Sequence, residues 1–169
     1  MQKNPEGFMI AITITERKSF MNRLFLTEYF DHFFLSEATF VTFNTFHIDG
    51  ILKKEYYTPD ELEIGQFTEQ QYSCWKQIRP FALSLIKGSH TPLEFKIIFR
   101  LSEKNVKKLL TQASLSYSVE DVNGLFLNLH FKAGTLTCTT GTSMTFFTLD
   151  KSLEKAWDDT IKKYLKDYC

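Results

Sequence analysis

Apolar and polar residues alternate in several short runs of the chain, which is the pattern of strands that bury one face. The clearest run is at 93–101, where every second residue from Leu93 to Leu101 is apolar. Residues 8–14 and 125–131 have the same period of two. Further runs at 33–35, 38–48 and 51–57 and a Thr-rich run at 135–149 complete the predicted strands, because Thr, Ile and Phe favour extended backbone.

Two of these runs stop at a two-residue step containing glycine and then resume. Asp49-Gly50 separates 38–48 from 51–57, and Ala133-Gly134 separates 125–131 from 135–149. Glycine tolerates the positive φ that tight hairpin turns require. The sequence therefore predicts a β-hairpin around each step, and Gly141 inside the last run predicts a β-bulge.

Helical spacing of apolar residues predicts four helices, at 16–27, 68–87, 103–113 and 152–168, with the second kinked or restarted at Pro80. Residues 58–66 (TPDELEIGQ) are predicted to be a loop. Each helix is preceded by polar residues that can accept hydrogen bonds from its free backbone N–H groups. These predicted caps are Thr15, Thr68 with Gln71, Ser102, and Asp150 or Ser152.

The order of predicted elements repeats along the chain. Residues 8–88 and 92–168 both follow the series strand, helix, strands and helix, and Gly50 and Asn44 correspond to Gly134 and Asn128. We therefore predict an α+β fold of two pseudo-symmetric βαβββ units with antiparallel sheets, each followed by an extra helix. One domain at 8–169 contains both units, after a polar and flexible lead-in at 1–7.

The composition of the chain indicates which cellular environment and which binding partners to expect. Twenty Lys and Arg balance twenty Asp and Glu, so no net field attracts the chain to nucleic acid or anionic lipid. Seventeen Phe indicate an aromatic core. The apolar run at 8–14 is much shorter than the roughly 20 residues of a membrane span. Three widely separated cysteines indicate neither a disulfide framework nor a zinc site. We expect a cytoplasmic protein without a membrane contact.

Residues that often carry chemistry do not form a recognisable motif. The four histidines lack metal-ligand spacing, and Cys138 is expected to be a small buried hydrophobe. No nucleophile elbow, phosphate loop or dinucleotide fingerprint occurs. We therefore predict no catalytic residue, metal or cofactor and a binding or scaffold role. The alternative is a small-molecule enzyme whose pocket is lined by His47, His130 and nearby hydroxyl groups.

The segment 105–147 (NVKKLLTQASLSYSVEDVNGLFLNLHFKAGTLTCTTGTSMTFF), together with the repeated strand, helix and hairpin order, resembles a DNA sliding-clamp domain. The resemblance implies a sheet on the outside of a ring and helices on the inside that contact double-stranded DNA irrespective of its sequence. The matching helices would contribute six cations. These are Arg17, Lys18, Arg23, Lys104, Lys107 and Lys108.

The chain departs from the clamp pattern in length and charge. Clamp chains usually join two or three such domains, so a ring of this protein would be a homo-oligomer. The helices at 68–87 and 152–168 are additional, and the net charge is zero. The whole chain also resembles an uncharacterised family of bacterial, mainly clostridial, proteins of unknown function, which implies no mechanism.

Overall fold

The computed structural model describes residues 10–169, which form a mixed α+β fold with one six-stranded sheet. All neighbouring strands are antiparallel, in the order β1-β6-β5-β4-β2-β3. The strands are β1 Ala11–Thr13, β2 Phe34–Val41, β3 Thr45–Asp49, β4 Glu94–Arg100, β5 Val122–Lys132 and β6 Thr135–Met144. The predicted fold class and antiparallel pairing are confirmed.

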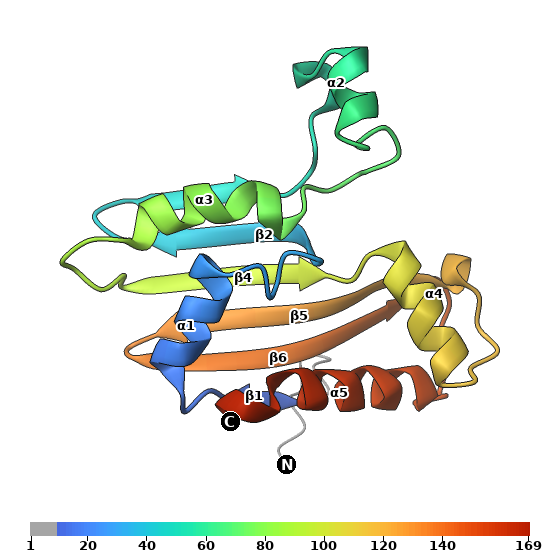
Figure 1. Cartoon of the computed structure of the whole chain (residues 1–169). Helices are drawn as coiled ribbons and strands as arrows, with labels where there is room; N and C mark the ends of the chain where they lie inside the picture. Colours follow the sequence, from blue (N-terminus) through green and yellow to red (C-terminus); the bar gives the residue numbers. More distant parts are fainter. Residues whose placement is uncertain (1–9) are drawn as a thin grey trace.

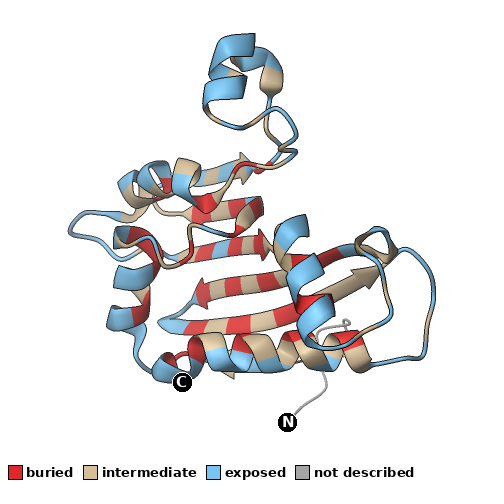
Figure 2. Ribbon diagram, turned by 45° about the vertical axis from the view of Figure 1, so that its right-hand side comes forward, coloured by how far each residue is buried: buried red, intermediate tan, exposed pale blue. Residues whose placement is uncertain are grey.

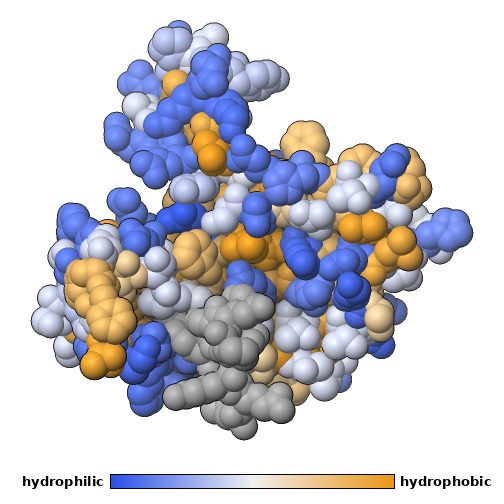
Figure 3. Space-filling model, turned by 180° about the vertical axis from the view of Figure 1, so that it is seen from behind, coloured by the Kyte–Doolittle hydropathy of each residue, from blue (hydrophilic) through white to orange (hydrophobic). Residues whose placement is uncertain are grey.

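Four helices lie on one face of the sheet (Figure 1). They are α1 Arg17–Leu26, α3 Trp75–Ile86, α4 Glu103–Gln112 and α5 Ser152–Leu165. A fifth, α2 Pro59–Ile64, belongs to an arm at residues 51–72 that stands away from the sheet beyond β3. The opposite face of the sheet carries no helix of the described residues and has a mixed hydrophilic and hydrophobic surface (Figure 3).

The core lies between the sheet and these four helices (Figure 2). Every second residue of β4 and β5 points into it, so Phe95, Ile97 and Phe99 are fully buried. The rings of Phe30 and Phe33 stack on Phe99 at centroid distances of 5.7 and 5.3 Å. Aromatic contacts of this kind stabilise beyond the area they bury. The prediction of a Phe-rich core is consistent with this packing.

The first hairpin differs from its prediction. β2 and β3 are joined by residues 42–44, and the Asp49-Gly50 step lies at the end of β3 instead of at the turn. Gly50 donates its N–H to the Ser36 carbonyl at 2.9 Å, and an added Cβ would lie 1.8 Å from the Leu35 carbonyl oxygen. Glycine is needed here for close backbone approach. The strand predicted at 51–57 is absent, and only Ile51 forms an isolated bridge, with Tyr72.

The second hairpin is confirmed. Ala133 and Gly134 have φ values of 49° and 76° and connect β5 to β6. The bulge predicted at Gly141 is wrong, because Gly141 pairs regularly with Phe126 and the irregularity lies between Val122 and Gly124. The Phe126 side chain packs across Gly141, with its Cβ 3.6 Å from the position a glycine Cβ would occupy. A Cβ added at this position would therefore make only ordinary contacts with the Phe126 side chain.

The helices of the second half begin close to their predicted positions. Ser102 caps α4 by accepting a hydrogen bond from the Asn105 N–H, as predicted. The Asp150 carboxylate accepts from the Ser152 N–H at the start of α5. Periodicity and cap agree in both helices, which explains why their positions could be predicted.

The helices of the first half differ more. α1 lacks the predicted Thr15 side-chain cap, and instead the N–H groups of Thr15 and Glu16 donate to the Tyr168 carbonyl. The capping box predicted at Thr68 is wrong, because α3 starts at Trp75 after Cys74. Pro80 lies inside α3, where it cannot donate the usual hydrogen bond to the carbonyl four residues earlier, but the helix continues to Ile86. Residues predicted to be a loop contain α2, which has its own capping box and a proline at its start.

The two halves share an element order but not a sheet environment. Each contains a strand, a helix and a hairpin, followed by a packed helix. However, β1 lies at an edge and pairs only with β6, whereas its expected counterpart β4 lies between β5 and β2. The described structure therefore does not confirm an internal duplication.

Candidate functional site

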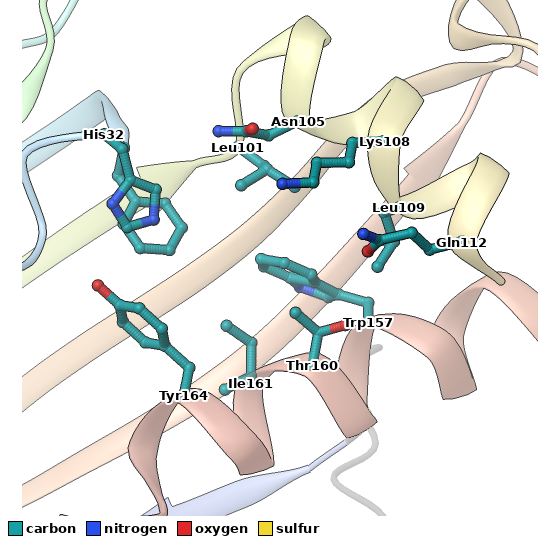
Figure 4. Close-up of a pocket in the computed structure, with 11 residues that line it drawn as sticks. His32, Leu101, Asn105, Lys108, Leu109, Gln112, Trp157, Thr160, Ile161 and Tyr164 are labelled. Atoms are coloured by element: carbon teal, nitrogen blue, oxygen red, sulfur yellow. The ribbon is translucent and has the colours of Figure 1, made fainter.

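A pocket of about 230 Å³ opens on the helix face of the sheet, between the segment 27–33, α4 and α5 (Figure 4). Its floor is aromatic and aliphatic, and its rim is polar. The lining residues are His32, Phe33, Leu101, Asn105, Lys108, Leu109, Gln112, Trp157, Thr160, Ile161 and Tyr164. An apolar floor with a few polar groups above it is the usual composition of a small-molecule site.

The wall at 27–33 is held by two sets of contacts. Tyr29 and Tyr164 each donate a hydroxyl hydrogen bond to the other's backbone carbonyl, and their rings stack at 4.6 Å. On the other side, the Arg79 guanidinium of α3 makes a two-pronged ion pair with Asp31 at 2.9 and 2.8 Å. These contacts fix the position of His32 at the pocket mouth.

The floor is fixed by the core and by α5. Phe33 packs on the sheet, and the Trp157 indole N–H donates to the Phe126 carbonyl at 2.9 Å. Thr160 donates its hydroxyl to the Ala156 carbonyl, as a helix-internal hydroxyl commonly does. These contacts hold the rings of Phe33 and Trp157 in one orientation.

The polar rim comes mainly from α4. Asn105, Lys108 and Gln112 are spaced by three and four residues, so they form one stripe along the helix. Figure 4 shows their side chains above the Trp157 floor. Among residues 10–169, none of these three side chains has a hydrogen-bond or ion-pair partner. They are therefore free to bind a ligand.

Burial favours the neutral forms of two ionisable groups of the pocket. Burial of the ring lowers the pKa of His32, opposed by a hydrogen bond with the Tyr29 backbone and by the charge of Asp31. Burial also raises the pKa of Tyr164 strongly, with smaller contributions from neighbouring Tyr29 and Tyr168. Since no lining residue is Asp or Glu, Lys108 carries the only full charge in the pocket.

The histidines of the alternative enzyme site do not meet. His47 on β3 and His130 on β5 both lie on the helix-free face of the sheet, but β2 and β4 separate them. Three strand spacings correspond to roughly 14 Å. His130 contacts Glu94 at 2.7 Å, and His47 contacts the Thr39 hydroxyl at 3.1 Å. Burial raises the pKa of the Cys138 thiol, which fits a small buried hydrophobe.

The six cations expected at a DNA surface lie on two helices that cover the same face of the sheet but different ends of it (Figure 1). On α1, Arg17 donates to the Gly134 carbonyl, and Arg23 lies 5.3 Å from the centre of the Tyr29 ring. On α4, the lysines make no ion pair within 10–169. These α4 residues are Lys104, Lys107 and Lys108.

Sequence reasoning identified Lys108 but missed the rest of the pocket. The stripe of Asn105, Lys108 and Gln112 is visible in the sequence as helical spacing of uncharged amides around a lysine. His32 carried no such signal, because only the tertiary fold brings it towards Tyr164, at a ring distance of 5.6 Å.

Metal-binding clusters and membrane-spanning helices are both absent from the described part of the chain. Within 10–169, no group of three His, Cys, Asp or Glu residues is arranged to hold a metal ion. None of the helices there is both long and apolar enough to cross a bilayer.

The chain was compared with protein families, curated proteins and solved structures. No curated protein matches it, and no solved structure matches it. The profile described as "Family of unknown function (DUF5721)" matches residues 23–169 and so includes α3, α4, α5 and nearly all of the sheet. The chain therefore belongs to this family of unknown function, DUF5721.

Proposed function

We propose that the protein is a non-enzymatic binding module that takes a small aromatic anion in the pocket between residues 27–33, α4 and α5. The observation that carries this proposal is the stripe of unpartnered polar groups on α4 above a rigid aromatic floor. Lys108 supplies a positive charge, and the Asn105 and Gln112 amides can donate to the same anionic group. A carboxylate or a phosphate satisfies this chemistry.

The size of the pocket limits the ligand. A cavity of about 150 Å³ is enough to hold benzene, and this pocket has about 230 Å³. One aromatic ring with a carboxylate or phosphate therefore fits, whereas a dinucleotide does not. Phe33 and Trp157, which are only 2% and 1% exposed, close the apolar floor on which the ligand ring would rest.

The chemistry of the pocket favours binding over catalysis. Tyr164 and Thr160 already donate their hydroxyl protons to backbone carbonyls. His32 has no carboxylate within the pocket to orient it as a general base, because Asp31 is engaged by Arg79. Without an activated nucleophile or a positioned base, the arrangement supports recognition of a ligand.

Replacing Lys108 by Met should weaken binding of phenyl phosphate and benzoate about tenfold or more, because a charge-assisted hydrogen bond contributes roughly 1.5–3 kcal/mol. Methionine keeps the length of the side chain and removes its charge. Affinity can be followed by tryptophan fluorescence, to which Trp157 in the pocket floor and the fully buried Trp75 both contribute.

Lys107 is the matched control, because it is an exposed lysine on the same helix that does not line the pocket. Lys107→Met should leave affinity unchanged. Equal losses in the two variants would show that only the general charge of α4 matters, and no fluorescence response to either probe in the wild type would contradict the pocket proposal.

Sequence-independent binding of duplex DNA is a second candidate, supported by the three lysines of α4 that lack an acidic partner and by the position of α1 on the same side of the sheet. Phosphate contacts by lysine need no shaped pocket. This candidate differs from the first in requiring Lys104 and Lys107 as well as Lys108.

Changing Lys104, Lys107 and Lys108 together to Glu should then abolish duplex binding for every sequence while leaving the fold intact, since all three are exposed. Wild-type affinity should fall steeply with salt, with a slope of about −0.9 per phosphate contact. Electrophoretic or anisotropy titrations at low salt test this. Wild-type protein that binds no duplex at low salt, or a triple variant with unchanged affinity, would contradict the proposal that the protein binds DNA.

A further inference from the structure

The strand β3 forms an open edge of the sheet. The backbone N–H and C=O groups of its even-numbered residues face β2. The hydrogen bonds Thr42 N–H to Asn44 O and Gly50 N–H to Ser36 O, one at each end of the hairpin, fix this alternation. Thr45, His47 and Asp49 therefore turn their backbone N–H and C=O groups outward, where no backbone group of residues 10–169 pairs with them. Natural edges are commonly blocked by charged side chains, proline or a bulge. β3 has no proline or bulge, and its one acidic residue, Asp49, lies at its end and is paired with Lys53.

An apolar shelf lies beside this edge. Arg79 marks the flank of α3 that faces Asp31 and the interior, so Ile78, Phe81 and Leu85 lie on the opposite flank, towards β3. Phe81 is 67% exposed there. At the β2–β3 turn, Phe43 is 86% exposed and contacts the Phe46 ring at 5.7 Å.

We propose that the β3 edge is covered by a second copy of this chain, whose β3 pairs antiparallel with it around a twofold axis at His47. An antiparallel edge is self-complementary, because each strand offers the same outward donors and acceptors to the other. His47 then lies opposite His47 of the second copy, and Thr45 lies opposite Asp49. The result is one continuous twelve-stranded sheet with the helices of both copies on the same side.

The distribution of charge favours a second copy over a charged partner. The outer flank of α3 carries no charged residue, and Asp49 is already paired with Lys53 at 3.0 Å. A strongly basic or acidic peptide would meet no opposite charge along the shelf. A second copy buries the shelf against its own equivalent without burying an unpaired charge.

The arm supports the same arrangement. It leaves the sheet at the end of β3 and projects past the β3 edge in both ribbon views (Figures 1 and 2). Continuing the His47-centred register beyond the strands places Phe43 of one copy beside Ile51 of the other, and Ile51 is 54% exposed. Each arm would then lie along the turn end of the other copy's sheet.

The arm contains more acidic than basic residues, and exposed Lys87 at the C-terminal end of α3 offers it one opposite charge. The acidic residues of the arm are Glu55, Asp60, Glu61, Glu63 and Glu69, and the basic ones are Lys53 and Lys54.

Sedimentation equilibrium of the full chain, from low to hundred-micromolar concentrations, should give a species of twice 19.8 kDa at the upper end. Phe43→Lys with Phe81→Lys should return it to a monomer, because both introduced charges would be buried in the contact between the two copies. Phe147→Lys is the matched control, since Phe147 is 89% exposed in the loop after β6 and should leave the dimer intact. Monomeric wild-type protein throughout, or a dimer that survives the double variant, would overturn the proposal.

Cross-linking tests the register. In a background with Cys74→Ser and Cys169→Ser, which leaves only buried Cys138, a short bis-maleimide should link His47→Cys to itself. Thr45→Cys mixed with Asp49→Cys should give a linked pair, in greater yield than either variant alone. Efficient self-linking of Asp49→Cys without that of His47→Cys would contradict the His47-centred arrangement.

Discussion

Gly50→Ala should destabilise the protein by at least about 3 kcal/mol, the upper range for forcing extra atoms into a packed site. The added Cβ would lie 1.8 Å from the Leu35 carbonyl oxygen and 2.7 Å from that of Ser36. Both oxygens belong to the backbone of β2, which is paired on both sides, and cannot rotate away. The β2–β3 pairing at this point must open, which also releases the Gly50 N–H bond to Ser36.

Urea denaturation of Gly50→Ala and Gly141→Ala provides the comparison. At Gly141 the nearest atom to an added Cβ is the Phe126 Cβ at 3.6 Å, an ordinary contact, so this control should change the unfolding free energy by less than about 1 kcal/mol. If Gly50→Ala were as stable as the control, the close backbone approach at the end of β3 would be wrong.

Arg79→Met should cost about 2–4 kcal/mol, because it leaves the Asp31 carboxylate buried without its partner. Asp31 and Arg79 are only 11% and 19% exposed in their side chains, so solvent cannot replace the lost interaction fully. The same change should weaken ligand binding, because this ion pair holds the segment that carries His32.

The double variant Asp31→Asn with Arg79→Met tests whether the two side chains stabilise the protein through their interaction with each other. Removing both charges should recover much of the lost stability, since no unpaired ion then remains in the interior. Thermal or urea unfolding of the two single variants and the double variant completes the cycle. Additive losses in the double variant would show that the two side chains act independently.

The second half of the fold could be predicted because local signals agree there. The alternation at 93–101, the Ser102 cap and the Ala133-Gly134 turn each indicate the same structure that tertiary packing produces. Such agreement between local preference and global fold makes prediction from pattern reliable.

The first half was harder to predict because glycine occurs both in tight turns and where two backbone segments approach closely. Asp49-Gly50 has the composition of a hairpin turn, but Gly50 is selected by contact with Leu35, which is distant in sequence. α2 was missed although Thr58, Pro59 and Glu61 form a capping box with proline at the first helical position, which is a recognisable local signal.

The residues of the candidate site could likewise be predicted only in part. Its α4 rim follows from helical spacing, so Lys108 and its neighbours can be read from the sequence. His32, Phe33 and Tyr164 come from segments that meet only through the Tyr29–Tyr164 and Asp31–Arg79 contacts. No pattern along the chain indicates these contacts, whereas His47 and His130 can be recognised in the sequence by residue type alone.

The central claim is that the pocket between residues 27–33, α4 and α5 binds a small aromatic anion. Titration of ¹⁵N-labelled protein with phenyl phosphate, followed by amide chemical shifts, tests it most directly. We predict that the largest changes fall on His32, Asn105, Gln112 and Thr160 and are lost in Lys108→Met but not in Lys107→Met. Changes confined to the helix-free face of the sheet, or no saturable change, would contradict the claim.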